Sequence, residues 1–415
     1  MISRALRLYE KEKGGFLFLS IVSNACAVVC MGISYLFNIL MARSLSISDF
    51  GLLGVAIAYY TILTIPGGSL GTILTREFSK LKKARKEREI AFLARQYAKK
   101  ALLYSGLVTL LVVIWALWTA KPEIALMVLL VPLSYALTPL NSVLQASERI
   151  VALSLLGLIG GILKLGLGFL AIALGLGLMG VAGAIPASAL IICIITVLLL
   201  QQFLSKKSKH DLSLKTALSL TTAILVIQGL FLYADLFAVQ NFLGNAQTGL
   251  YNVAETTAKI TYFLSGAVIL VLLPKMAKLD LSKNKKEVLL LLLGGAGFLL
   301  PPALVLIGFP SEIVLLFYGD KFAAAIPAFQ ALAAGFLIYA LFNIVQYALL
   351  AKGKERDVLA INAAGLILHV LLLAYFVPLQ GLVGAGTAVI ISSTALLAAS
   401  VLALLYYSRA KTGNA

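Results

Sequence analysis

Twelve long apolar segments constrain this chain more than any other feature of its sequence. Each has about 18 or more predominantly apolar residues, which is the length a helix needs to cross about 30 Å of hydrocarbon. Their ranges are 15–42, 50–73, 101–119, 124–146, 150–174, 178–202, 217–240, 249–272, 288–309, 323–350, 357–379 and 382–406. We therefore predict an all-α polytopic membrane protein with twelve transmembrane helices.

Composition excludes the common soluble classes. Of the 415 residues, 61% are hydrophobic and 12% are charged, whereas a soluble domain has about 25% charged residues. The spans leave only short connectors. The longest polar stretch, 76–100, is predicted to be the end of a span that runs into an amphipathic helix on the membrane surface, over 80–100. Soluble enzymes, nucleic-acid-binding domains and secreted disulfide scaffolds are therefore excluded.

The positive charges predict the orientation in the membrane. With the N-terminus inside, 29 of the 34 Lys and Arg residues fall in inner segments, whereas Arg43, Lys121 and Lys321 fall outside. By the positive-inside rule, both termini are expected to be cytoplasmic, in a multi-pass protein of the cell membrane. We interpret the net charge of +17 as a topology signal and as contact with anionic membrane lipids, not as a nucleic-acid site.

Three short repeats indicate an internal duplication. DFGLLGVA at 49–56 returns as QTGLYNVA at 247–254, and GLMGVAGA at 177–184 returns as GLVGAGTA at 381–388, with four of eight positions identical in each pair. Tyr-Ala-Leu at 135–137 returns at 339–341. Offsets of 198 and 204 residues predict two six-helix bundles, 1–205 and 206–415, related by a pseudo-two-fold axis along the membrane normal, with a substrate path at their interface.

Motifs of soluble enzymes occur only out of context. Residues 175–180 match GxGxxG but lie between apolar spans, with no strand before them. The sequence has two histidines and no GxxxxGK[ST] motif, and its three cysteines have no metal-ligand spacing. We therefore predict that the protein is not an enzyme and binds no metal. A membrane glycosyltransferase would require a larger surface loop than 310–322, and a scaffold would not require buried cations.

Ionisable residues inside the spans are the candidates for function. An ionisable side chain in hydrocarbon costs about 2.5–3.5 kcal/mol on insertion scales, so each one needs a reason. The set comprises Lys164, Asp235, Glu255, Lys259 and His369. Neutral hydrogen-bonding groups are added by Gln228, Asn241, Asn343, Gln346 and Asn362. Structural explanations stay open: Glu255 and Lys259 can neutralise one another at i,i+4, Asp235 can be solvated at the outer interface, and His369 can be a packed neutral ring.

Several segments resemble a known family. ARSLSISDFGLLGVA (42–56), NFLGNAQTGLYNVAETTAKI (241–260), LPKMAKL (273–279), YGDKFAAAIPAFQAL (318–332) and GLVGAGTAVIIS (381–392) are similar to the Wzx-type polysaccharide flippases. This family belongs to the MOP superfamily, with the MATE exporters and the lipid II flippase. The resemblance implies two bundles of six helices, alternating access and outward movement of a lipid-linked oligosaccharide that bears a phosphate or pyrophosphate. A MATE-like cation-coupled exporter of small molecules is the alternative, although residues 15–42 lack the acid that one route of MATE coupling uses.

Roles for the buried residues follow from such a substrate. An anionic headgroup needs positive charge in a region of low dielectric, so Lys164 and Lys259, one from each half, and Arg43 are the predicted substrate-binding residues. Asp235 and Glu255, with Asn362 and Thr387, are the predicted site for a coupling cation or proton. No cofactor is expected beyond Na⁺ or H⁺, and the protein is expected to act as a monomer. The membrane potential alone could also drive export, at about 2.3 kcal/mol per charge per 100 mV.

Overall fold

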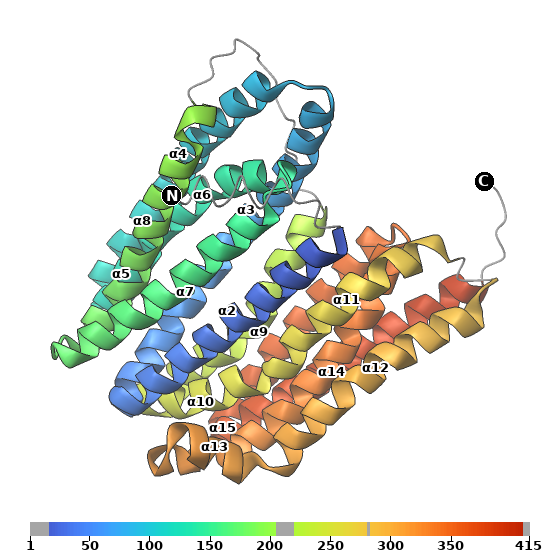
Figure 1. Ribbon diagram of the computed structural model, residues 1–415. Coiled ribbons are helices and arrows are strands. Elements are labelled where there is room, and N and C mark those ends of the chain that lie inside the picture. Colours follow the sequence, from blue (N-terminus) through green and yellow to red (C-terminus); the bar gives the residue numbers. More distant parts are fainter. Residues whose placement is uncertain (1–15, 205–219, 280–282, 410–415) are drawn as a thin grey trace. The chain divides into compact units, whose positions relative to one another are not determined.

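The computed structural model describes residues 16–204, 220–279 and 283–409, with the backbone alone for 16–25 and 27. All regular structure within these ranges is helical (Figure 1). Among the described residues, ten helices are long and apolar enough to cross a membrane. That count takes Pro122–Ala146, Asn245–Lys278 and Asp320–Leu350 each as one helix, and a shorter apolar helix covers Val28–Ser44.

Contacts between residues divide the chain into two compact units. The first comprises Met1–Leu45 with Ala56–Ala217, and the second comprises Ser46–Val55 with Leu218–Ala415. The helices of the first unit are α2 (Phe16–Ser44), α3 (Ile47–Lys83, from Ala56 onward), α4 (Glu87–Trp118), α5 (Pro122–Val128), α6 (Leu130–Ala146), α7 (Ile150–Ala173) and α8 (Gly177–Leu204).

The second unit contains the remaining helices. They are α9 (Leu220–Leu243), α10 (Asn245–Ala258), α11 (Ile260–Lys278), α12 (Lys285–Gly308), α13 (Pro310–Tyr318), the 3₁₀ helix η1 (Asp320–Ala325), α14 (Ile326–Leu350) and α15 (Glu355–Arg409). The sequence boundary expected at 205/206 falls in 205–219, which lies outside the described residues. The second unit also takes up Ser46–Val55, the first turns of α3, which sequence reasoning placed in the first half.

One helix contains two of the predicted spans. With 55 residues at about 1.5 Å each, α15 is more than twice as long as one crossing needs. It breaks at Gly381, whose φ of 61° is a left-handed conformation that favours glycine. Gly177, 204 residues earlier, begins α8 with φ 55°. The repeat found in the sequence is therefore also a repeat of backbone conformation.

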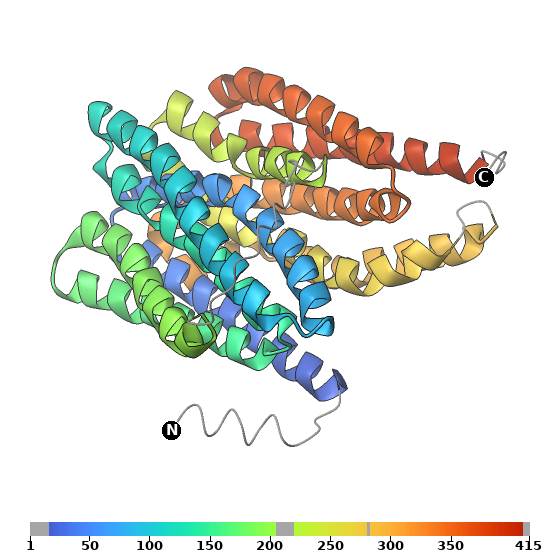
Figure 2. The same ribbon diagram turned by 90° about the horizontal axis from the view of Figure 1, so that it is seen from above.

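These elements confirm the predicted all-α class. The ten long helices, the second crossing contributed by α15 and the helix α2 give twelve spans within the described residues. Six belong to each unit, as the two-bundle prediction requires. Figure 2 shows the same helices from above.

The polar stretch 76–100 differs from expectation. The predicted span end is present, because α3 continues to Lys83, but 80–100 is not one surface helix: a turn at Arg85, with φ 58°, separates α3 from α4. The apolar side chains of 76–100, including Phe78, Ile90, Leu93 and Ala94, belong to a core cluster with residues of α6, α7 and α8. Because this apolar face is buried within the first unit, it is not available to lie on lipid.

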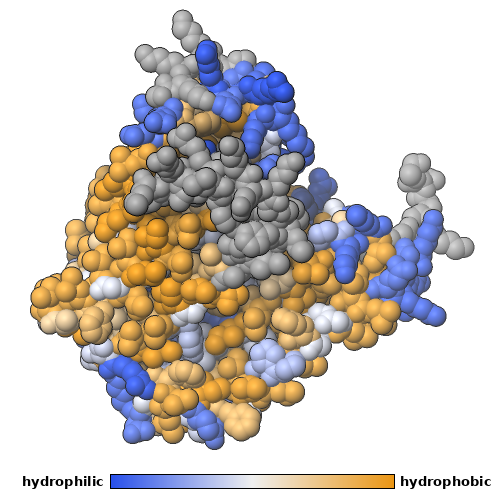
Figure 3. All heavy atoms as spheres, in the orientation of Figure 1, coloured by the Kyte–Doolittle hydropathy of each residue, from blue (hydrophilic) through white to orange (hydrophobic). Residues whose placement is uncertain are grey.

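The second unit has a buried central helix, whereas the visible outer face of the protein is largely apolar. In the second unit α14 is the central helix, and α10, α11, α12 and α15 pack against it. Of the most apolar 18-residue stretch of this helix, 67% is buried. Figure 3 shows hydrophobic side chains over most of the visible face, with hydrophilic side chains in separate groups. Leu111, Trp118 and Leu270 are examples of large apolar side chains left exposed. An apolar face of this extent fits contact with hydrocarbon and not with water.

Candidate functional site

Lys164 lies half-buried on α7 in the first unit, facing α2. Its ammonium group donates a hydrogen bond to Ser34 Oγ at 3.2 Å and lies 5.0 Å from the centre of the Phe37 ring. Gly168 faces the same ring, and a Cβ atom there would come within 2.7 Å of it. Close packing against glycine thus brings α2 near enough to supply the two contacts of Lys164. In the part of the chain that the structure describes, no carboxylate forms a salt bridge with Lys164.

The other predicted lysine has different surroundings. Lys259, between α10 and α11 in the second unit, is 5% exposed and forms an ion pair with Glu255, one turn earlier. Its ammonium group also donates to the backbone carbonyl oxygen of Leu232 on α9. Two aromatic rings complete its surroundings, Tyr233 at 4.3 Å and Phe336 at 5.6 Å. Glu255 and Lys259, which the sequence places at i and i+4, are therefore in direct contact.

Asp235 is held at the same turn of α9. Its carboxylate accepts a hydrogen bond from the Tyr251 hydroxyl at 2.7 Å and one from the backbone amide of Leu236 at 2.8 Å. In an α-helix the usual acceptor for the Leu236 amide is the Leu232 carbonyl, which is also the oxygen that Lys259 contacts. One helical turn of α9 thus carries Asp235 and also contacts Lys259, through the Leu232 carbonyl oxygen.

We call Asp235, Glu255 and Lys259 the charged cluster. All three are buried, at 1%, 2% and 5% exposure. Two carboxylates and one ammonium group leave one negative charge uncompensated if all three are ionised. A buried group of unbalanced charge is costly, so the arrangement favours binding one further positive charge, either a proton or a monovalent cation. Within the described residues, no group of three or more His, Cys, Asp or Glu residues is placed to hold a metal ion.

Asn362 lies in a separate polar network. Its amide nitrogen donates to Gln346 Oε1 at 3.0 Å, Gln346 donates to Asn343 Oδ1 at 2.7 Å, and Asn343 donates to Ser265 Oγ at 2.9 Å. These bonds connect α11, α14 and α15. The four side chains are 0–6% exposed.

Two predicted residues are not brought into these groups. Thr387 donates to the Val383 carbonyl at 3.1 Å and to Gln380 Oε1 at 3.4 Å, both on its own helix α15. Arg43 lies exposed in the last turn of α2. The roles predicted for both residues stay predictions.

Sequence reasoning missed several partners. Tyr251 lies one turn before Glu255 on α10, and that spacing could have indicated a shared helix face. Ser34 and Phe37 carried no such signal, because they are about 130 residues from Lys164 in the sequence. His369, which packs as an aromatic ring against Phe231 at 4.2 Å, also forms a hydrogen bond between Nδ1 and Ser392 Oγ at 2.9 Å.

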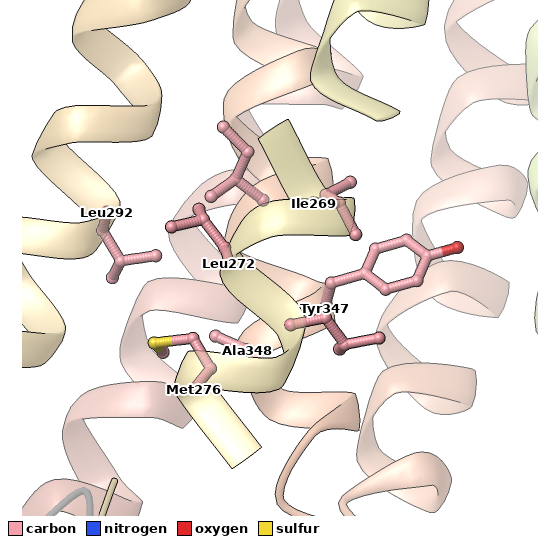
Figure 4. Close-up of a pocket in the computed structure, with 8 residues that line it drawn as sticks. Ile269, Leu272, Met276, Leu292, Tyr347 and Ala348 are labelled. Carbon is pink, nitrogen blue, oxygen red and sulfur yellow. The ribbon is translucent and has the colours of Figure 1, made fainter. Parts of the chain in front are cut away.

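A pocket in the second unit is lined by none of the charged-cluster residues (Figure 4). It is lined by Ile269, Leu272, Leu273, Met276, Leu292, Ile344, Tyr347 and Ala348. The hydroxyl group of Tyr347 points away from the other labelled side chains. The lining offers no charged group for an anionic ligand.

Comparison with solved structures identifies the fold. An inward-facing multidrug resistance transporter of the MATE family, from the MOP superfamily, matches with a TM-score of 0.73 and 13% identity, over 97% of each chain. Lipid II flippase MurJ in an inward closed conformation matches with a TM-score of 0.69 and 12% identity, over 94% of this chain and 90% of MurJ. A MOP superfamily transporter from Pyrococcus furiosus, whose binding pocket is described as having reverse polarity, matches with a TM-score of 0.60 and 13% identity, over 94% of each chain.

Comparison of sequences gives the family. No curated protein matches the chain. Residues 40–327, more than half of its length, match the sequence profile of the polysaccharide biosynthesis protein family. The chain is therefore a multi-pass membrane protein that belongs to the polysaccharide biosynthesis protein family.

Proposed function

We propose that the protein is a flippase that moves a lipid-linked oligosaccharide, bearing a phosphate or pyrophosphate, from the inner to the outer leaflet by alternating access. Membership in the polysaccharide biosynthesis family supports a role in supplying a polysaccharide precursor. The similarity of fold to a lipid II flippase supports movement of a lipid-linked substrate. We propose a transporter and not an enzyme.

The observation that carries this proposal is the environment of Lys164. A half-buried ammonium group with a hydroxyl and an aromatic ring as its contacts keeps its positive charge available for a phosphate. Lysine binds phosphate as a point charge, and desolvation strengthens that interaction. We therefore assign Lys164 as the main contact of the anionic headgroup, with Arg43 as a secondary contact.

Lys259 would need to give up a partner to bind the same headgroup. Its ammonium group already contacts Glu255 and the Leu232 carbonyl. In the proposed cycle, Lys259 contacts the substrate only when Glu255 has been released, for example by protonation. Asp235 and Glu255 then take part in coupling to H⁺ or Na⁺, with Asn362 and Thr387 as further candidate ligands in another conformation.

The remaining features of the proposal concern the cell. We place the protein in the plasma membrane, with both termini in the cytoplasm, acting as a monomer on its lipid-linked substrate and in contact with membrane lipids. Outward movement of an anion is favoured by an inside-negative potential at about 2.3 kcal/mol per charge per 100 mV. A cation gradient is therefore an addition to this driving force and not a requirement.

A MATE-like cation-coupled exporter of small molecules is the second candidate. The similarity of fold to a multidrug transporter and two buried acids in one unit favour it. An exporter of organic cations would use acids to bind its substrate, whereas the flippase proposal depends on Lys164. Replacement of Lys164 therefore discriminates between the two candidates.

The test is surface display of a polysaccharide in a strain that lacks its own flippase. Lys164→Ala should lower display about tenfold or more, the factor that corresponds to about 1.4 kcal/mol, while Lys164→Arg should be milder because the charge is kept. Lys80→Ala is the matched control, because Lys80 is an exposed lysine paired with Glu77. Normal display with Lys164→Ala, at equal protein level in the membrane, would refute the proposed role of this lysine.

A further inference from the structure

Buried polar atoms without a hydrogen-bond partner gather in the second unit. Among the described residues, five of them belong to this unit: Thr261 Oγ1, Tyr339 Oη, His369 Nε2, Ser393 Oγ and Ser400 Oγ. Their side chains are at most 1% exposed. A buried polar group that makes no hydrogen bond bears its full desolvation cost, so such groups in native proteins usually bind ordered water or a ligand.

Two of these atoms lie at one level, next to the charged cluster. Asn343 on α14 donates to Ser265 on α11 at 2.9 Å, and one turn earlier on these helices lie Tyr339 and Thr261. The ring centres of Tyr262 and Tyr339 are 5.4 Å apart, which confirms that the helices stay adjacent at this level. The Phe336 ring lies 5.6 Å from the Lys259 ammonium group and 6.5 Å from the Tyr339 ring, so this level adjoins the Glu255–Lys259 ion pair.

The other three atoms lie along the two halves of α15. His369 pairs with Ser392 across these halves. Because the halves run in opposite directions, a residue two turns before His369 faces a residue two turns after Ser392–Ser393. Asn362 therefore faces Ser400, and Asn362 is also bonded to Gln346.

Phe231 lies between the two sets of atoms. Its ring is stacked on His369 at 4.2 Å and on Tyr339 at 4.7 Å. We name the whole set of side chains the polar seam: Thr261, Ser265, Tyr339, Asn343, Gln346, Asn362, His369, Ser392, Ser393 and Ser400. It extends over α11, α14 and α15 from the level of the ion pair to the level of Asn362.

We propose that ordered water molecules occupy the polar seam and give protons access to the Glu255–Lys259 ion pair. An apolar cavity stays dry, whereas a site that has room for a water molecule and offers it two to four polar partners binds water. Hydroxyl, amide and imidazole groups line the seam, and each kind can both donate and accept as water requires. The proton-access role rests on the proposed transport function, whereas the hydration does not.

The titratable groups around this route come from each packed helix. Asp235 and Tyr233 lie on α9, Glu255 and Tyr251 on α10, Tyr262 on α11, Tyr339 and Tyr347 on α14, and His369 on α15, with Lys259 at the junction of α10 and α11. Among them the carboxylates of Glu255 and Asp235 are the groups able to exchange a proton while Lys259 keeps its charge. The seam reaches the level of Lys259, the ion-pair partner of Glu255, whereas Asp235 is held by Tyr251 and Leu236.

Radiolytic hydroxyl-radical footprinting with mass spectrometry tests the hydration on the full chain in lipid nanodiscs. Radicals formed from bound water label neighbouring side chains even when these are buried. Tyr339 should be labelled several-fold more than Phe329, an aromatic residue of the same helix that is also buried. Labelling of Tyr339 at the level of Phe329 would overturn the proposal.

A variant series tests the role of the seam. Thr261→Val keeps the shape of the side chain and removes its hydroxyl group, so it should reduce the labelling of Tyr339. Thr109→Val in the first unit is the control, since Thr109 also has a buried hydroxyl without a partner among the described residues.

Transport separates the two parts of the proposal. The double variant Thr261→Val/Ser393→Ala should slow proton-coupled display of the polysaccharide severalfold. Reduced labelling with unchanged transport would refute proton access while leaving the flippase proposal intact. Normal transport by Lys164→Ala would instead refute the flippase proposal and would not affect the labelling result.

Discussion

The two buried lysines show how one residue type takes on different chemistry. Lys164 contacts a hydroxyl group and a ring, whereas Lys259 contacts a carboxylate, a carbonyl and two rings. An ammonium group that already has an anionic partner binds a second anion only after losing the first. Lys164 is therefore the better candidate for direct substrate contact, and Lys259 is the better candidate for a step that depends on Glu255.

The Glu255–Lys259 ion pair leads to a prediction about stability. Lys259→Met should destabilise the folded protein by about 3–5 kcal/mol, because it leaves a buried carboxylate without its counter-ion. Adding Glu255→Gln to Lys259→Met should recover most of this loss. The measurement is thermal unfolding in detergent, with Lys80→Met as the exposed control.

The same variants separate structure from function. If the ion pair only neutralises charge, the double variant should fold and also transport. If Lys259 contacts the substrate, the double variant should fold and fail to transport. A Lys259→Met single variant as stable as the parent would contradict the ion pair itself.

At the scale of elements, the two copies of the repeated octapeptide pack against each other. A Cβ atom on Gly51 would come within 2.6 Å of the Asn245 carbonyl oxygen and the Gly249 nitrogen, and one on Gly249 within 1.8 Å of the Ile47 carbonyl oxygen. Asn252 donates to the Phe50 carbonyl at 3.1 Å. The start of α3 is thus fixed to α10 by backbone contact that only glycine permits.

Gly249→Ala should disrupt this crossing. The added methyl group meets backbone atoms that cannot move aside, so we expect a loss of about 1–3 kcal/mol or more. Gly266→Ala on α11 is the matched control, because a Cβ atom there has no neighbour within 4 Å. The readout is the thermal midpoint in detergent, and equal midpoints for the two variants would contradict the close packing.

At the scale of the whole molecule, orientation depends on the distribution of charge along the sequence. The segments predicted to lie inside contain 29 of the 34 Lys and Arg residues. Green fluorescent protein fused after residue 415 should therefore fluoresce, and alkaline phosphatase fused at residue 319 should be active, because the first requires the cytoplasm and the second the outside. An active phosphatase at the C-terminus would reverse the orientation that the flippase proposal requires.

Much of the architecture was predictable because the signals for it are local. The length of each apolar segment fixes a helical crossing regardless of its neighbours, since a backbone in hydrocarbon has no other hydrogen-bond partners. The repeat with an offset of 204 residues identified Gly177 and Gly381, and both have left-handed backbone conformations. The contact between Glu255 and Lys259 followed from helix geometry alone.

The surroundings of each buried charge depended on the tertiary structure. Asp235 meets Tyr251 on another helix, Lys259 meets a backbone carbonyl of α9, and Lys164 meets Ser34 from far away in the sequence. No spacing along the chain specifies such contacts, because they depend on which helix faces pack together. The sequence by itself therefore determined the helices, the repeat and the list of costly residues. Only the tertiary structure decided which hydroxyl, carbonyl and aromatic groups of other helices surround each lysine, since those contacts are made by packing between helices.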